Sequence, residues 1–207
     1  MVQKVTGSPP RRRGRPRAYD PEAALDEATK AFWRTGYSGT SLDDLAAATG
    51  MNRPSLYAAF GDKRTLYLKV LDRYWNLGFA AMREALAYDR PLPEALTRLY
   101  DRALSMYFSR DGLARGCFAI GTAATEAVED PLIRAAFAQG LRTLDQGFEA
   151  RIRAAHASGE IRIDADPAAL AMLAAATLHT IAIRARAGMA RPELEELARK
   201  AVGVICA

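Results

Sequence analysis

Apolar residues recur every three or four positions along most of the chain, which is the spacing of amphipathic helices. Together with helix-capping residues and Gly or Pro breaks, this spacing predicts about nine helices. They are expected over residues 20–36, 41–50, 52–61, 63–88, 93–109, 116–126, 130–157, 167–187 and 191–205. Ile161 and Ile163 alternate with polar residues, but the short stretch between two helices leaves no room for a sheet. The pattern therefore predicts an all-α fold.

Residues 40–63 have the pattern of two short helices joined by a tight turn. Ser41 is a favourable N-cap for the first helix, and Gly50 follows its last position. Asn52 is a favourable N-cap for the second helix, and Gly61 ends it. Two capped helices around such a turn indicate a helix-turn-helix, whose second helix enters the major groove of DNA. A helical hairpin inside a larger bundle is the alternative.

The second of these helices has one apolar side. Leu56 and Phe60 lie four positions apart and are expected to face the core, which leaves the other faces free for DNA. Arg and Ser side chains bind base edges or phosphates, Tyr reaches phosphate oxygens, and helix N-termini present N–H groups to phosphates. The candidate DNA contacts in this region are Thr40, Ser41, Arg53, Pro54, Ser55, Tyr57 and Lys63.

The segment from Phe32 to Leu68 resembles the tetracycline-repressor (TetR) family of bacterial regulators. The resemblance is carried by Ala31-Phe32, Gly36-Tyr37, Gly39-Thr40-Ser41, Leu45-Ala46, Ala48, Gly50-Met51, Leu56-Tyr57, Phe60, Lys63 and Leu66. It implies an N-terminal three-helix DNA-binding domain, expected here over 20–63, and a C-terminal helical domain for ligand binding and dimerisation, expected over 64–207. Family members often carry a basic residue or His after the tyrosine, where this chain has Ala58-Ala59.

The positive charge of the chain is concentrated at its N-terminus. Six of the 29 basic residues lie in 1–19, which contains no acid, so the rest of the chain holds 23 basic against 24 acidic residues. The Pro- and Gly-rich composition of this segment predicts a disordered arm, in which Arg13 and Arg15 are candidate contacts to the DNA backbone or minor groove. Because 20–63 is acidic overall, the arm is expected to matter for affinity. A solubilising tail is the alternative.

Composition also limits the function classes. The chain has two Cys and two His residues, too few for a disulfide framework or a metal site, and we expect no metal and no cofactor. We find no nucleophile–base–acid set and no phosphate-binding loop, so no catalytic residue is expected and the protein is not predicted to be an enzyme. The most apolar stretch, 168–183, contains His179 and reads as a buried helix. We therefore predict a cytoplasmic protein without a membrane partner.

The last two predicted helices indicate self-association. The helix at 167–187 is apolar on nearly all sides, and the one at 191–205 is amphipathic, so both need more cover than one chain offers. A symmetric four-helix interface in a homodimer supplies that cover, and the TetR resemblance implies the same arrangement. Two-fold symmetry would also match two recognition helices to a palindromic operator in double-stranded DNA. A core confined to one chain is the alternative.

Aromatic and Met side chains on the predicted helices, with a few polar neighbours, suggest a small-molecule site. The candidate ligand-binding residues are Trp75, Phe79, Met82, Tyr107, Phe118, Thr122, Glu126, Phe148 and His179. Aromatic residues at helical spacing are also usual in a packed core. The TetR resemblance implies a small, largely apolar effector between the fourth, fifth, sixth and seventh helices, which would tilt the fourth helix and release a repressor from DNA. The alternative is a ligand-independent DNA-binding protein whose C-terminal domain only dimerises.

Overall fold

The computed structural model describes residues 20–108 and 114–207. These residues form nine helices and no strand, and an isolated antiparallel bridge joins Phe108 to Ala114. The helices are α1 (Pro21–Thr35), α2 (Leu42–Thr49), α3 (Arg53–Phe60), α4 (Lys63–Ala85), α5 (Leu92–Tyr107), α6 (Phe118–Glu126), α7 (Pro131–Ala157), α8 (Pro167–Arg186) and α9 (Arg191–Ile205). The predicted all-α fold is confirmed. The sequence Arg110-Asp111-Gly112 predicts a turn after the fifth helix, but these residues lie outside the described ones.

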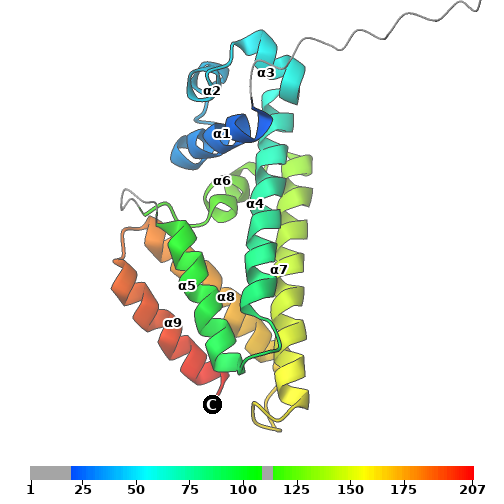
Figure 1. Cartoon of the computed structure of the whole chain (residues 1–207), viewed down its shortest axis with the longest axis vertical. Helices are drawn as coiled ribbons and strands as arrows, with labels where there is room; N and C mark the ends of the chain where they lie inside the picture. The colour runs from blue at the N-terminus through cyan, green and yellow to red at the C-terminus, as the bar shows by residue number, and fades with distance from the viewer. Residues whose placement is uncertain (1–19, 109–113) are drawn as a thin grey trace, which may run out of the picture.

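The helices form a small head on a larger helical body (Figure 1). α1, α2 and α3 gather at one end, and α4 runs from this head along α7 through the length of the body. α5, α8 and α9 pack together on the other side of α4, and the short α6 lies between the head and the body. Since α4 contacts both parts, it is a direct mechanical link between them, and the predicted domain division at 63/64 stays a prediction.

Local capping decides where the two short helices of the head begin and end. The Ser41 hydroxyl accepts a hydrogen bond from the backbone N–H of Asp44, and the Asp44 carboxylate accepts one from the backbone N–H of Ser41. Gly50 has φ of 67°, a left-handed conformation that favours glycine. The Asn52 side chain accepts from the backbone N–H of Ser55 at 2.9 Å. These interactions confirm the predicted caps and create the turn between α2 and α3.

Several of the other helix bounds differ from the expected ones. α4 ends at Ala85 rather than near 88, and α5 begins at Leu92, at the Pro91-Leu92-Pro93 break. The helix predicted from 116 begins at Phe118, because Gly116 has φ of 65° and Cys117 is extended. The space around Gly116 is also tight, since a Cβ there would lie 2.5 Å from the carbonyl oxygen of Ala182 on α8.

α4 and α7 approach each other closely at two glycines of α7. A Cβ on Gly140 would lie 2.0 Å from the Trp75 ring, and a Cβ on Gly147 would lie 2.6 Å from the Met82 side chain. Trp75 and Met82 both belong to α4, so the absence of a Cβ at the two glycines of α7 provides the space into which these α4 side chains pack. The register of α4 along α7 therefore depends on these glycines.

Replacing Gly140 with alanine should destabilise the protein by about 1–3 kcal/mol, because the added methyl overlaps the Trp75 ring and an overpacked core must shift. Thermal or urea unfolding would measure this change. Gly203→Ala on α9 is the control, because a Cβ there meets nothing within 4 Å and alanine favours a helix, which should stabilise by about 0.5–1 kcal/mol. Equal stability of the two variants would contradict the close α4–α7 contact.

Arg151 on α7 joins three segments at the far end of the body. Its side chain is only 2% exposed, and its guanidinium donates to the Glu160 carboxylate at 3.1 Å and to the backbone carbonyl oxygen of Arg90 at 2.9 Å. Glu160 also accepts from the backbone N–H of Leu92 at 2.6 Å. The pair thus fastens the α4–α5 connection and the α7–α8 connection to α7.

These contacts make the free energy of unfolding depend on pH in the acid range. The hydrogen bond from Arg151 lowers the pKa of Glu160 below its ordinary value of 4.5. A lowered pKa in the folded state adds stability above the unfolded-state pKa, and this contribution is lost as pH falls through the folded-state pKa. Unfolding measured from pH 6 to about pH 3 should show that loss, and Glu160→Gln should reduce the pH dependence. An unchanged pH profile in this variant would contradict the contribution of Glu160.

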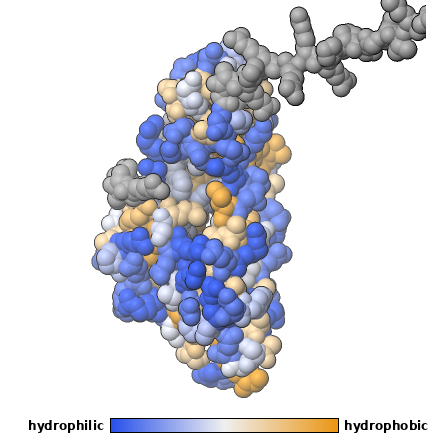
Figure 2. All heavy atoms as spheres, in the orientation of Figure 1, coloured by the Kyte–Doolittle hydropathy of each residue, from blue (hydrophilic) through white to orange (hydrophobic). Residues whose placement is uncertain are grey.

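α8 is apolar on its outward side. Met172, Leu173 and Ile183 are 71%, 37% and 55% exposed, whereas α9 carries Arg199 and Lys200 at exposed positions. The face seen in Figure 2 is mostly hydrophilic, with scattered apolar residues. By length and composition, α8 is the one helix among the described residues that reaches the threshold for crossing a membrane, and 44% of its most apolar window is buried. α8 was predicted to be a buried helix, and in one chain it is only partly covered.

Candidate DNA interface and effector cavity

α3 lies at the outer end of the head (Figure 1), and its first turn is exposed. Arg53, Pro54 and Ser55 are exposed, and Tyr57 keeps 48% of its surface accessible. Leu56 and Phe60 are buried, at 2% and 5% exposure. The predicted inward and outward faces of α3 are confirmed, and they leave hydrogen-bonding side chains on the surface of a helix of the width that a major groove accepts.

Arg53 is held by a carboxylate of the preceding helix. Its Nε donates to one oxygen of Asp43 at 2.6 Å, and its Nη2 donates to the other oxygen. This hydrogen-bonded pair lowers the pKa of Asp43. Asp43 was not among the predicted contact residues, although an acid in the first turn of α2 can be read from the sequence. The pairing of Asp43 with Arg53 cannot be read from the sequence, because the two residues are ten positions apart and meet only when the turn forms.

Thr40 lies inside the head and does not face the surface. It is 1% exposed, and its hydroxyl donates to the carbonyl oxygen of Gly36 at 2.6 Å. Its backbone N–H donates to the carbonyl oxygen of Tyr37 at 3.2 Å. Both groups that a phosphate would use are therefore engaged within the protein. The structure places Thr40 as a residue that shapes the loop before α2, while its neighbour Ser41 is exposed.

Lys63 begins α4 beside the head, but its amine is partly shielded. The ammonium lies 4.4 Å from the centre of the Tyr37 ring, a cation–π contact. Burial lowers the pKa of Lys63. This position is compatible with the predicted contact between Lys63 and the phosphate backbone of DNA, which stays a prediction. Arg13 and Arg15, the two candidate contacts of the arm, lie outside the described residues.

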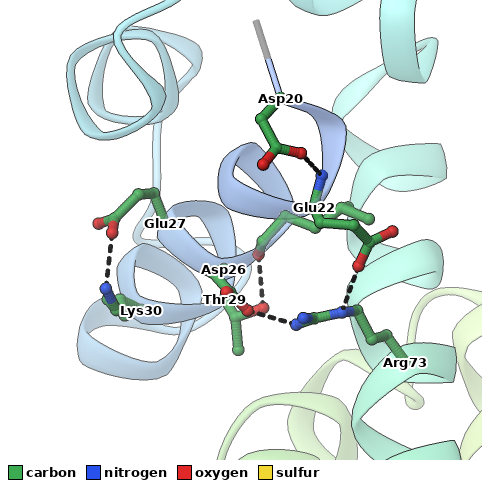
Figure 3. A network of polar contacts seen from close by, with 8 residues as sticks. Asp20, Glu22, Asp26, Glu27, Thr29, Lys30 and Arg73 are labelled. Atoms are coloured by element: carbon green, nitrogen blue, oxygen red, sulfur yellow. Dashed lines mark hydrogen bonds and ion pairs between the residues drawn. The ribbon is translucent and has the colours of Figure 1, made fainter.

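The acidic residues of α1 are partly neutralised from outside the head. Figure 3 shows Arg73 of α4 between Glu22 and Asp26, with an ion pair to each, and Lys30 paired with Glu27. The excess of acid counted over 20–63 did not include Arg73, because α4 was assigned to the other domain. Tertiary contact therefore reduces the negative charge of the head, and it also ties α1 to α4.

A small apolar cavity lies in the body, next to α4. Its volume is about 70 Å³, and its aromatic and thioether wall consists of Tyr74, Trp75, Phe79, Met82, Met106 and Tyr107. Leu144, Leu178 and His179 close it from α7 and α8, and Cys117 and Ile120 from the start of α6. Five of the predicted ligand residues therefore lie on one cavity: Trp75, Phe79, Met82, Tyr107 and His179.

The other four predicted ligand residues lie elsewhere. Phe118 packs edge-to-face against Trp33 and at tilted angles against Tyr67 and Tyr74. The Thr122 hydroxyl lies 2.7 Å from the Tyr67 hydroxyl, so Phe118 and Thr122 both belong to the junction of head and body. Glu126 accepts a hydrogen bond from the Ser38 hydroxyl at 2.9 Å, across the same junction. Phe148 is fully buried in the core. These residues share helices with the cavity wall but point to different neighbours, which helical spacing alone does not distinguish.

The polar groups on the cavity wall are mostly uncharged. The Tyr74 hydroxyl donates to the Cys117 sulfur at 3.2 Å, and burial raises the pKa of the Cys117 thiol. Burial also lowers the pKa of His179, which favours the neutral imidazole. Arg102 is a charged residue at the wall, paired with Glu84. In the described part of the chain, no group of three or more His, Cys, Asp or Glu side chains is placed to hold a metal ion.

Comparison with known families gives two matches. Residues 24–70 match the model for bacterial regulatory proteins of the tetR family, which covers α1 through the first part of α4. Residues 93–202 match the model for the tetracyclin repressor-like C-terminal domain. The second match alone spans more than half of the chain.

Individual relatives agree with these matches. The chain is 44% identical over 115 residues to the transcriptional repressor ComR of Escherichia coli, and this match covers 55% of this chain and 54% of ComR. It is 35% identical over 120 residues to the transcriptional repressor BdcR of the same species, and this match covers 58% of this chain and 59% of BdcR. It thus spans little more than half the length of these relatives. It also matches a solved complex of the TetR family regulator CifR, carrying cysteine substitutions, with a 26 bp operator DNA, at TM-score 0.79 and 30% identity over 92% of this chain and 98% of CifR.

Proposed function

Since the chain belongs to the TetR family of bacterial regulatory proteins, we propose that it is a cytoplasmic transcriptional repressor that binds a palindromic operator as a homodimer. The observation that carries the proposal is the exposed N-terminal half of α3, which presents Arg53, Ser55 and Tyr57 between the capped helices α2 and α4. The relatives named as repressors, and the operator complex of CifR, support the same role.

The outward face of α8 supports the dimer. Met172 and Ile183 on this face, together with Val204 on α9, are more than half exposed in one chain. Exposed apolar side chains gathered on one face mark an interaction surface. We place α8 at the centre of the dimer interface and α9 beside it, because the exposed Arg199 and Lys200 suit the solvated edge of an interface.

The cavity supports a small-molecule effector over the ligand-independent alternative. An engineered apolar cavity of about 150 Å³ accepts benzene, so one of about 70 Å³ holds such a molecule only if its walls move apart. Trp75 and Met82 on this wall belong to α4, which begins at the head. A small, largely apolar effector would therefore displace α4 and change the position of α3. To release DNA it must favour the displaced shape by about 1–3 kcal/mol or more.

The operator is tested by selection of random duplex DNA on the purified protein at near-physiological salt. We expect enrichment of a palindrome whose half-site centres are about one helical turn or a little more apart, because two recognition helices related by two-fold symmetry enter successive major grooves. Binding without enrichment that fades steadily as salt rises would overturn the operator and leave only nonspecific attraction.

The effector is tested by screening small apolar compounds for loss of the selected complex. Trp75 fluorescence reports occupation of the cavity, and Trp33→Phe removes the signal of the other tryptophan of the chain. A compound that fills the cavity should change this fluorescence and lower operator affinity together. Occupation of the cavity without any change in DNA affinity would favour the ligand-independent alternative.

A further inference from the structure

Arg53 and Asp43 form an ion pair at the exposed end of the head. Asp43 lies in the first turn of α2 and Arg53 is the first residue of α3, so the pair spans the turn of the helix-turn-helix. The arginine side chain is 55% exposed and the aspartate side chain 71% exposed. Since neither fills the core, the pair is free to serve the surface that faces DNA.

The carboxylate occupies one particular edge of the guanidinium. Asp43 accepts from Nε and Nη2, the side edge of the group. The five donors of an arginine form a fixed fork, so the end edge, made of Nη1 and the second donor of Nη2, points away from the carboxylate. An arginine with two parallel donors free is the side chain that binds O6 and N7 of guanine in the major groove.

Asp43 does not make the hydrogen bonds that cap α2. The neighbouring Asp44 accepts the hydrogen bonds from Ser41 that complete the capping box. A carboxylate at this surface repels phosphates and so weakens binding to any DNA. Its benefit is rigidity, because an arginine without such a partner loses more rotamer freedom when it is fixed on a base.

We propose that Asp43 is a positioning residue that holds Arg53 for reading a guanine in each operator half-site. The inference rests on the proposed function and deepens it, because it assigns one base of the operator to one side chain. Asp43 itself contacts no base. It lowers the affinity for all DNA through its charge and raises the selectivity through the orientation of Arg53.

The test measures base preference in full-length variants. Wild type, Asp43→Asn, Arg53→Ala and the double variant are titrated with the selected operator and with duplexes in which one G·C pair at a time is replaced by A·T. We expect wild type to prefer guanine at one half-site position by about tenfold or more. Asp43→Asn should bind random DNA at least as well as wild type but lose at least two thirds of that preference. Arg53→Ala should lose the preference entirely.

The double variant and a charge control test whether Asp43 acts through Arg53 or only through its negative charge. If Asp43 acts through Arg53, adding Asp43→Asn to Arg53→Ala changes the base preference no further. Glu27→Gln removes an exposed carboxylate of α1 that pairs with Lys30, so it should leave base preference unchanged. Circular dichroism checks folding, and Asp43→Ser replaces Asp43→Asn if that variant is unfolded.

Two results overturn the inference and leave the proposed function intact. One is an unchanged guanine preference in Asp43→Asn, and the other is a guanine preference that survives in Arg53→Ala. If wild type selects no palindrome at all, the proposed function fails first, and the assignment of a base to Arg53 falls with it.

Discussion

Replacing Arg151 with alanine should lower the free energy of unfolding by about 3 kcal/mol. Removal of one partner from a buried ion pair costs about 3–5 kcal/mol, because the other charge is left without compensation. We expect the lower end of this range, since the Glu160 side chain is 31% exposed and water can reach it. The variant also loses the hydrogen bond to Arg90 and so frees the α4–α5 connection from α7.

Urea unfolding followed by circular dichroism measures the effect, and α7 offers a matched control two positions along. Arg153 pairs with Glu149 at the surface, one helical turn away, so Arg153→Ala should cost no more than about 0.5 kcal/mol. Arg151→Met combined with Glu160→Gln removes both charges and keeps much of the volume, and it should recover part of the loss. If Arg151→Ala and Arg153→Ala are equally stable, Arg151 does not fasten the two connections.

Replacing both Arg53 and Tyr57 with alanine should reduce operator affinity by about 2–4 kcal/mol, roughly 30- to 1000-fold. A bidentate contact from arginine to a base contributes about 1–3 kcal/mol of discrimination, and the tyrosine hydroxyl adds a contact to the phosphate backbone. Unpaired Asp43 would then add repulsion from the phosphates. Stability should change little, because both side chains are about half exposed.

Titration of the selected operator at constant salt measures this loss. The matched control is Arg83→Ala with Tyr88→Ala, which should keep wild-type affinity. Both residues are exposed, and they lie in the last turn of α4 and just beyond it, at the end of α4 that is far from the head. Unfolding of the Arg53 and Tyr57 variant would mean that these residues support the core. A folded, dimeric variant with wild-type affinity would show that α3 does not enter the groove.

The sequence by itself determined the helices and most of their ends. Helical spacing of apolar residues, and local signals such as Ser41 before α2 and Gly50 after it, act over a few residues and need no tertiary contact. The exposed face of α3 followed in the same way from Leu56 and Phe60, because two residues four positions apart must share a side of a helix. Membership of the TetR family was recognisable from the same short region.

The tertiary structure decided which side chains meet across helices. It placed Trp75 and His179 on one cavity and took Phe118 and Thr122 to the head–body junction, although all four lie on helices with apolar stripes. It also turned Thr40 inward and gave Arg53 its partner. The spacing of residues along a helix defines a face, but the neighbour of that face depends on how helices cross, and crossing is set by the packing of the whole core.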